Sequence, residues 1–143
     1  MANSDLEACK KQVAKEIKAF GQQTEQICKK AKPLREEEAE LAKKKDPSSD
    51  EKQRAVDLRK ALQDLEKSYL TQADSASERI NKILKTNVPD DKKEIPEWQK
   101  GMAPWYREML QKEAGLDLGK DVKLTGDISI KDQKVMIMLN GKF

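Results

Sequence analysis

The chain has 143 residues, of which 38% are charged, 36% are hydrophobic and only 4% are aromatic. This length suits one domain, and the composition is typical of long helices rather than of a globule with a large core. The formal net charge of +3 comes from 29 basic and 26 acidic side chains that alternate along the chain. Interleaved charges solvate a helix and lack the one-sided basic stripe of duplex-binding proteins, so they disfavour nucleic-acid binding.

Residues that the sequence lacks exclude several chemistries. There is no histidine, which removes triads with an imidazole base and zinc sites that need histidine. The glycines are scattered and form no phosphate-binding loop. We therefore predict a protein that is not an enzyme, and we nominate no catalytic residue, no cofactor and no metal site.

The chain also lacks the signals of a membrane protein. No stretch approaches the ~18 apolar residues of a spanning helix, and no signal peptide precedes the first helix. We expect a soluble protein. Met1 followed by Ala-Asn-Ser-Asp fits either a cytoplasmic protein or an exported one whose leader Met1 replaced, so the compartment stays open.

The N-terminal part predicts a long helix over about residues 4–44. Ser4 and Glu7 fit a capping box, in which each side chain satisfies a free backbone amide of the first turn. Apolar residues then recur every seven positions: Leu6, Val13, Phe20, Ile27, Leu34 and Leu41. A strict seven-residue period predicts a seam that faces a partner helix, as in a coiled coil. Pro33 is expected to kink or divide this helix.

A second helix is predicted over about residues 49–86. Pro47 ends the first helix, and Ser48 with Glu51 offers another capping box. The short connection predicts an antiparallel hairpin with Leu34 opposite Leu62. A hairpin alone buries one stripe of each helix, so the C-terminal region or a second copy of the chain should cover the rest.

The C-terminal region predicts one short helix and a β-hairpin. Pro104 is suited to the first turn of a helix from Trp105 to Ala114, which Gly115 would end. Alternating apolar residues in 122–130 and an apolar run in 135–139 predict a hairpin, with 122–125 as an optional third strand.

The fold class is therefore mainly α (α+β). It consists of a long antiparallel helical hairpin, or a coiled-coil-like bundle, with a short third helix and a C-terminal β-hairpin. Residues 1–88 form the helical hairpin, and residues 89–143 pack on it as part of the same domain.

The two cysteines leave two alternatives open. Cys9 and Cys28 would lie about 28 Å apart on a continuous helix, beyond the reach of a disulfide. A disulfide within one chain therefore requires a break in the first helix, and Gly21 is the best point for it. The other possibility is a disulfide between two copies of the chain. Otherwise they are two small, semi-buried thiols.

Five residues are candidates for partner binding. Trp98, Trp105 and Tyr106 form an aromatic segment that suits either an interface or the closure of the core, and we favour closure. Met136 and Met138 lie on the opposite face of the last strand from Val135, Ile137 and Leu139. They suit an adaptable binding patch or core filling, and we favour filling.

We predict a non-enzymatic protein-binding module of the inhibitor, immunity-protein, chaperone or adaptor type. It would use a helical face or the edge of the C-terminal strand to engage another protein. The alternative is a self-assembling structural coiled coil, which would be a homodimer. Weak nucleic-acid binding is a lesser alternative.

Overall fold

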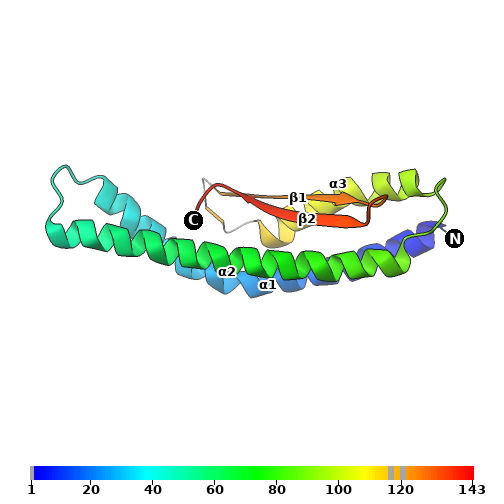
Figure 1. Ribbon diagram of the computed structural model, residues 1–143, viewed down its shortest axis with the longest axis horizontal. Helices are drawn as coiled ribbons and strands as arrows, with labels where there is room; N and C mark the ends of the chain where they lie inside the picture. Colours follow the sequence, from blue (N-terminus) through cyan, green and yellow to red (C-terminus); the bar gives the residue numbers. More distant parts are fainter. Residues whose placement is uncertain (1, 116–117, 120–121) are drawn as a thin grey trace.

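The computed structural model describes residues 2–115, 118–119 and 122–143, with side chains from residue 5 onward. Its elements are α1 (Ala2–Ala42), α2 (Ser49–Asn87), α3 (Ile95–Ala114), β1 (Lys123–Ser129) and β2 (Lys134–Asn140). α1 and α2 form a long antiparallel hairpin, and α3 and the β-hairpin lie along part of it as a second layer (Figure 1). The predicted fold class is confirmed. No helix of the described residues is long and apolar enough to cross a membrane.

α1 is one helix from Ala2 to Ala42, with Pro33 in its interior. The predicted division at Pro33 is therefore wrong. A proline removes one backbone hydrogen bond, but contacts with α2 before Pro33, such as Glu16–Arg79, and after it, such as Glu37–Arg54, stabilise the helix. The helix already includes Ser4, and the side chain of the capping box predicted there lies outside the described residues.

The second capping box is confirmed at the start of α2. The Glu51 amide donates to Ser48 Oγ at 3.2 Å, and the Ser48 amide donates to Glu51 Oε1 at 3.0 Å. Glu51 also pairs with Lys44 across the connecting turn. This hydrogen bond from Lys44, followed by those from Ser48, lowers the pKa of Glu51 to about 2. The cap thus fixes the turn between α1 and α2 as well as the end of the helix.

The buried positions of the long helices recur every eleven residues, not every seven. In α1 they are Cys9, Val13, Ile17, Phe20, Thr24, Cys28 and Ala31. In α2 they are Leu58, Leu62, Tyr69, Ala73, Ala76, Ile80 and Leu84. A seven-residue stripe drifts ~20° around a straight helix in every seven residues, whereas an eleven-residue stripe drifts about the same angle only in every eleven residues and in the opposite sense. The predicted seam consequently leaves the core, and Ile27, Leu34 and Leu41 are only half-buried.

α3 is longer than predicted, because it begins at Ile95 instead of Trp105 and carries Pro104 in its interior. Pro96 lies in the first turn, where the missing N–H is harmless. The buried residues of α3 are Trp98, Met102, Ala103, Tyr106 and Leu110. Burial of this face outweighs the hydrogen bond lost at Pro104. The helix ends at Ala114, with Gly115 as its cap, as predicted.

β1 and β2 form the predicted antiparallel hairpin, with Ile128 opposite Val135 and Lys123 opposite Asn140. Residues 122–125 do not form a separate third strand, because β1 runs without interruption from Lys123 to Ser129. In the turn, Gln133 adopts a φ of 50°.

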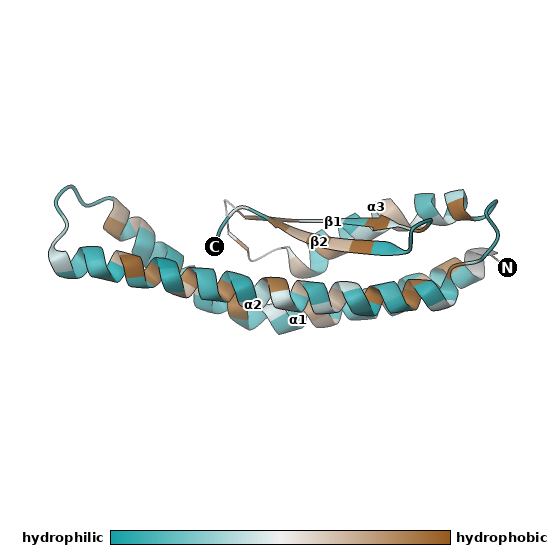
Figure 2. Ribbon diagram, in the orientation of Figure 1, coloured by the Kyte–Doolittle hydropathy of each residue, from teal (hydrophilic) through white to brown (hydrophobic). Residues whose placement is uncertain are grey.

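The five elements close a ring around one core. α1 packs on α2 and α3, β1 packs on α3 and β2, and β2 packs on α2. A single cluster of buried side chains contains residues of every element. The end of the helical hairpin that holds the connecting turn projects beyond the second layer (Figure 1). In Figure 2, hydrophobic residues recur at intervals along α2 and gather in the β-hairpin.

Candidate partner-binding face

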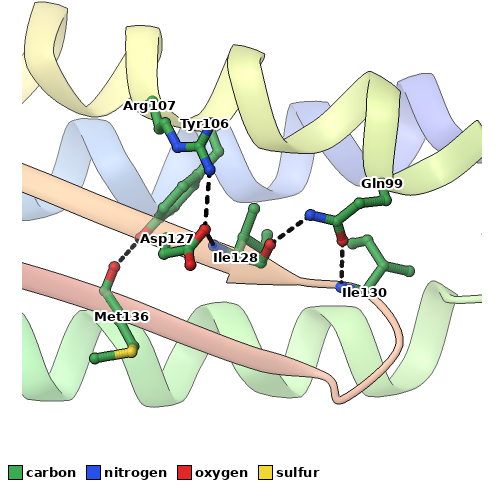
Figure 3. A network of polar contacts seen from close by, with 7 residues as sticks. All are labelled: Gln99, Tyr106, Arg107, Asp127, Ile128, Ile130 and Met136. Atoms are coloured by element: carbon green, nitrogen blue, oxygen red, sulfur yellow. Dashed lines mark hydrogen bonds and ion pairs between the residues drawn. The ribbon is translucent and has the colours of Figure 1, made fainter. Parts of the chain in front are cut away.

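The predicted aromatic segment does not form a common surface. Trp98 and Tyr106 are buried in the core, while Trp105 is half-buried with Lys10 Nζ 5.8 Å from its ring centroid. Tyr106 Oη donates to the Met136 carbonyl at 3.1 Å (Figure 3). The ring passes close to Gly126, where a side chain would leave it no space. Burial, and secondly the charge of Asp127, raises the pKa of Tyr106 far above its usual value, so this hydroxyl is a neutral donor.

The free edge of β1 is sealed by side chains. Gln99 of α3 donates to the Ile128 carbonyl and accepts from the Ile130 amide, both at 2.8 Å (Figure 3). Asp127 Oδ1 accepts from the Ile128 amide at 2.9 Å and from Arg107 at 3.1 Å. Gln99 thus takes the place of a neighbouring strand at Ile128 and Ile130, and α3 packs along β1.

The other edge of the hairpin faces α2. The Ile128 backbone groups bond away from β2, so Ile128 and Val135 form a pair without mutual hydrogen bonds. Val135, and Ile137 two residues later, therefore turn their N–H and C=O groups toward α2. Both residues are buried, at 7% and 8% exposed, because α2 packs along β2. α2 thus lies beside this edge, where a further strand would have to pair.

Met136 and Met138 lie on the opposite face of β2 and are 38% and 42% exposed. Core filling, the role that we favoured for them, is therefore wrong for these two residues. The described residues cover the face of β2 that carries Val135 and Ile137 and leave the opposite face exposed. Two methionines remain side by side on the outer face, two residues apart on one strand.

A surface groove of about 370 Å³ separates β2 from α2. Its lining residues are Asp74, Ser77, Glu78, Asn81, Val135, Met136 and Ile137. Leu70, which is 37% exposed, precedes Asp74 by one turn and so lies on the same flank of α2. We call the groove together with Leu70 and Met138 the α2–β2 face.

The α2–β2 face gathers three of the four exposed large hydrophobic side chains in the described part of the chain: Leu70, Met136 and Met138. The fourth, Val56, lies several turns away toward the start of α2. The sequence identified Met136 and Met138 but not the α2 residues. Leu70 is an apolar residue on an otherwise polar flank of α2, and it could have indicated this part of the face. That interpretation requires knowing that β2 packs beside this flank.

The polar groups of the groove have few partners in the chain. Neither Asp74 nor Glu78 forms an ion pair with any described residue, and both are exposed. Asn81 Oδ1 is shielded from solvent and accepts no hydrogen bond within the described residues. Ser77 Oγ donates to the Ala73 carbonyl at 2.9 Å. The groove thus presents two exposed carboxylates for which no described residue supplies a counter-ion.

The cysteines lie outside this face. Cys9 and Cys28 are both buried on the continuous helix α1, and no disulfide joins them. The disulfide alternative is therefore wrong for a single chain, because α1 does not break at Gly21. Burial raises the pKa of Cys9 to about 11, which keeps this thiol protonated at neutral pH.

Among the residues that the structure describes, no three histidine, cysteine or acidic side chains are grouped to hold a metal ion. Comparisons of the chain with protein-family models, with curated proteins and with solved structures found no match.

Proposed function

We propose that the protein is a non-enzymatic protein-binding module that engages another protein through the α2–β2 face. The observation that carries this proposal is the gathering of Leu70, Met136 and Met138 beside a groove with two exposed carboxylates. Single exposed hydrophobic residues are ordinary, but adjoining ones rimmed by polar groups are typical of interaction sites. Methionine also adapts its shape to a partner better than branched side chains do.

The geometry favours a side-on contact over strand addition. A helix lies along each edge of the β-hairpin: α3, through Gln99, beside β1 and α2 beside β2. A partner would therefore contact the flank of α2 and the outer face of β2 together. Full burial of one large apolar side chain contributes roughly 1.5–3 kcal/mol. These three side chains are about two-fifths exposed, so covering them would contribute roughly 1 kcal/mol each.

The self-assembling coiled coil is less well supported. That alternative needs the α1 seam at an interface between two copies, but Phe20 is fully buried within one chain. Its ring makes an edge contact with Tyr69 of α2, with 5.5 Å between the centroids. Val13 and Phe20 of the seam are already buried within one chain, so a second copy would have to displace α2 or α3 to reach them.

The test is a pull-down at about 150 mM salt with the tagged wild-type chain and two variants. Met136→Gln/Met138→Gln removes the apolar surface of β2, and Val56→Gln makes a similar change outside the face. We expect a protein that the wild type and Val56→Gln retain and that the methionine variant binds at least about tenfold less tightly. Both variants should keep the wild-type circular dichroism spectrum, because all three side chains are exposed.

Two outcomes would overturn the proposal. One is a partner that the methionine variant retains as well as the wild type does. The other is a pull-down that recovers no protein except the bait, combined with sedimentation experiments in which the chain is a dimer. That result would favour self-assembly.

A further inference from the structure

We infer that the groove of the α2–β2 face receives an arginine side chain of the protein partner. This inference rests on the proposed function and specifies the chemistry of the partner.

The charge of the groove points to a cation. Asp74 and Glu78 are one helical turn apart, so both carboxylates lie on the same flank of α2. The three arginines of α2 that form ion pairs, Arg54, Arg59 and Arg79, all pair with glutamates of α1. They therefore occupy the side of α2 that faces α1. Within the described residues, the flank that faces β2 keeps two carboxylates without a counter-ion.

The number of acceptors favours a guanidinium over an ammonium. Besides the two carboxylates, the groove holds the Val135 and Ile137 carbonyls, which the pairing of the hairpin turns toward α2. A guanidinium has five N–H donors in one plane, which can serve several acceptors at once, whereas an ammonium acts as a compact point charge. A planar guanidinium between the two walls of the groove could donate hydrogen bonds to acceptors on both of them.

The opposite wall of the groove suits the stem of the same side chain. Val135, Met136 and Ile137 line it, and long basic side chains bury their methylene groups against apolar surface while the charged head remains polar. Leu70 lies one helical turn before Asp74, and Met138 lies two residues after Met136 on the same face of β2. The complementary segment of a partner is therefore an arginine with apolar neighbours.

The test uses acetyl-Leu-Arg-Leu-amide and the same peptide with citrulline, which keeps the shape of arginine but carries no charge. Titration into the full-length ¹⁵N-labelled chain should give saturable amide shifts at Asp74, Glu78, Asn81, Val135 and Ile137. We expect the citrulline peptide to bind at least about tenfold more weakly, because charge-assisted hydrogen bonds are lost. Asp74→Asn/Glu78→Gln should abolish the shifts, and Val56→Gln should leave them unchanged.

Equal shifts with citrulline, shifts confined to other surfaces, or no effect of Asp74→Asn/Glu78→Gln would overturn the inference. A lysine peptide that binds as tightly would overturn the assignment to arginine. The proposed function is judged separately. If the captured partner depends on Met136 and Met138 but not on Asp74 and Glu78, the inference fails and the function stands. If the arginine peptide binds but no captured protein depends on the methionines, the function fails.

Discussion

Gly21 determines how closely α1 and α3 approach each other. A methyl group at this position would collide with the carbonyl oxygen of Glu113, which is backbone and cannot turn aside. Gly101 of α3 is a different case, because a methyl there would meet the end of the Leu6 side chain at 2.7 Å. A side-chain terminus can move to another rotamer. The atoms in contact with Gly21 thus belong to backbone that cannot move aside, whereas those in contact with Gly101 belong to a side chain that can.

We predict that Gly21→Ala lowers the free energy of unfolding by about 1–3 kcal/mol, because the added methyl overpacks the contact. In an exposed helix, the same substitution stabilises by about 1 kcal/mol. Gly101→Ala is the matched control and should change stability much less. Urea denaturation of both variants is the measurement. A Gly21→Ala protein as stable as the wild type would show that α1 and α3 lie farther apart than described.

Among the elements, β1 depends on a helix for its outer edge. A two-stranded hairpin is marginally stable by itself, and its edge groups need partners when they are buried. Ile128 and Ile130 are each 1% exposed, and Gln99 supplies both missing hydrogen bonds. A side chain of α3 therefore completes the sheet.

Gln99→Ala should lower the free energy of unfolding by about 2–4 kcal/mol, since it leaves two buried backbone groups unpaired at roughly 1–3 kcal/mol each. Gln53→Ala is the control, because the Gln53 side chain is exposed and donates, within the described residues, to Asp57 on its own helix. Its effect should remain within about 0.5 kcal/mol. Equal losses from the two substitutions, measured by chemical denaturation, would contradict the role assigned to Gln99.

At the scale of the whole molecule, the closed ring makes each element depend on its neighbours. The core cluster draws on all five elements, and removing any one of them opens the ring. The closed arrangement predicts that the helical hairpin and residues 89–143 unfold together, as expected of one domain.

The two layers can be monitored separately. Both tryptophans lie in α3, so fluorescence follows the second layer, while far-UV circular dichroism follows mainly α1 and α2. We expect coincident unfolding curves from the two signals. Phe20→Ala, which should cost about 3–5 kcal/mol, should move both midpoints equally although Phe20 belongs to α1. A shift of the circular dichroism curve alone would mean that the second layer folds independently.

Part of the candidate face was accessible from the sequence. Met136 and Met138 stood out by the alternation of the last strand, but that alternation could not say which face the chain covers. Leu70, Asp74 and Glu78 were missed because their role follows only from the packing of β2 along this flank of α2. Trp98 and Tyr106 were candidates for the surface as well as the core, and their burial depends on contacts with residues far away in the chain.

The sequence by itself determined the start and end of α2, the capping box at Ser48, the end of α3 at Gly115 and the β-hairpin. These features depend on residues within a few positions of each other, where caps, turns and alternation act. Only the tertiary structure decided that α1 continues through Pro33, that α3 begins at Ile95 and that burial follows an eleven-residue period. Local rules place breaks at prolines and seams at heptads, whereas the free energy that overrides them comes from faces packed against distant elements.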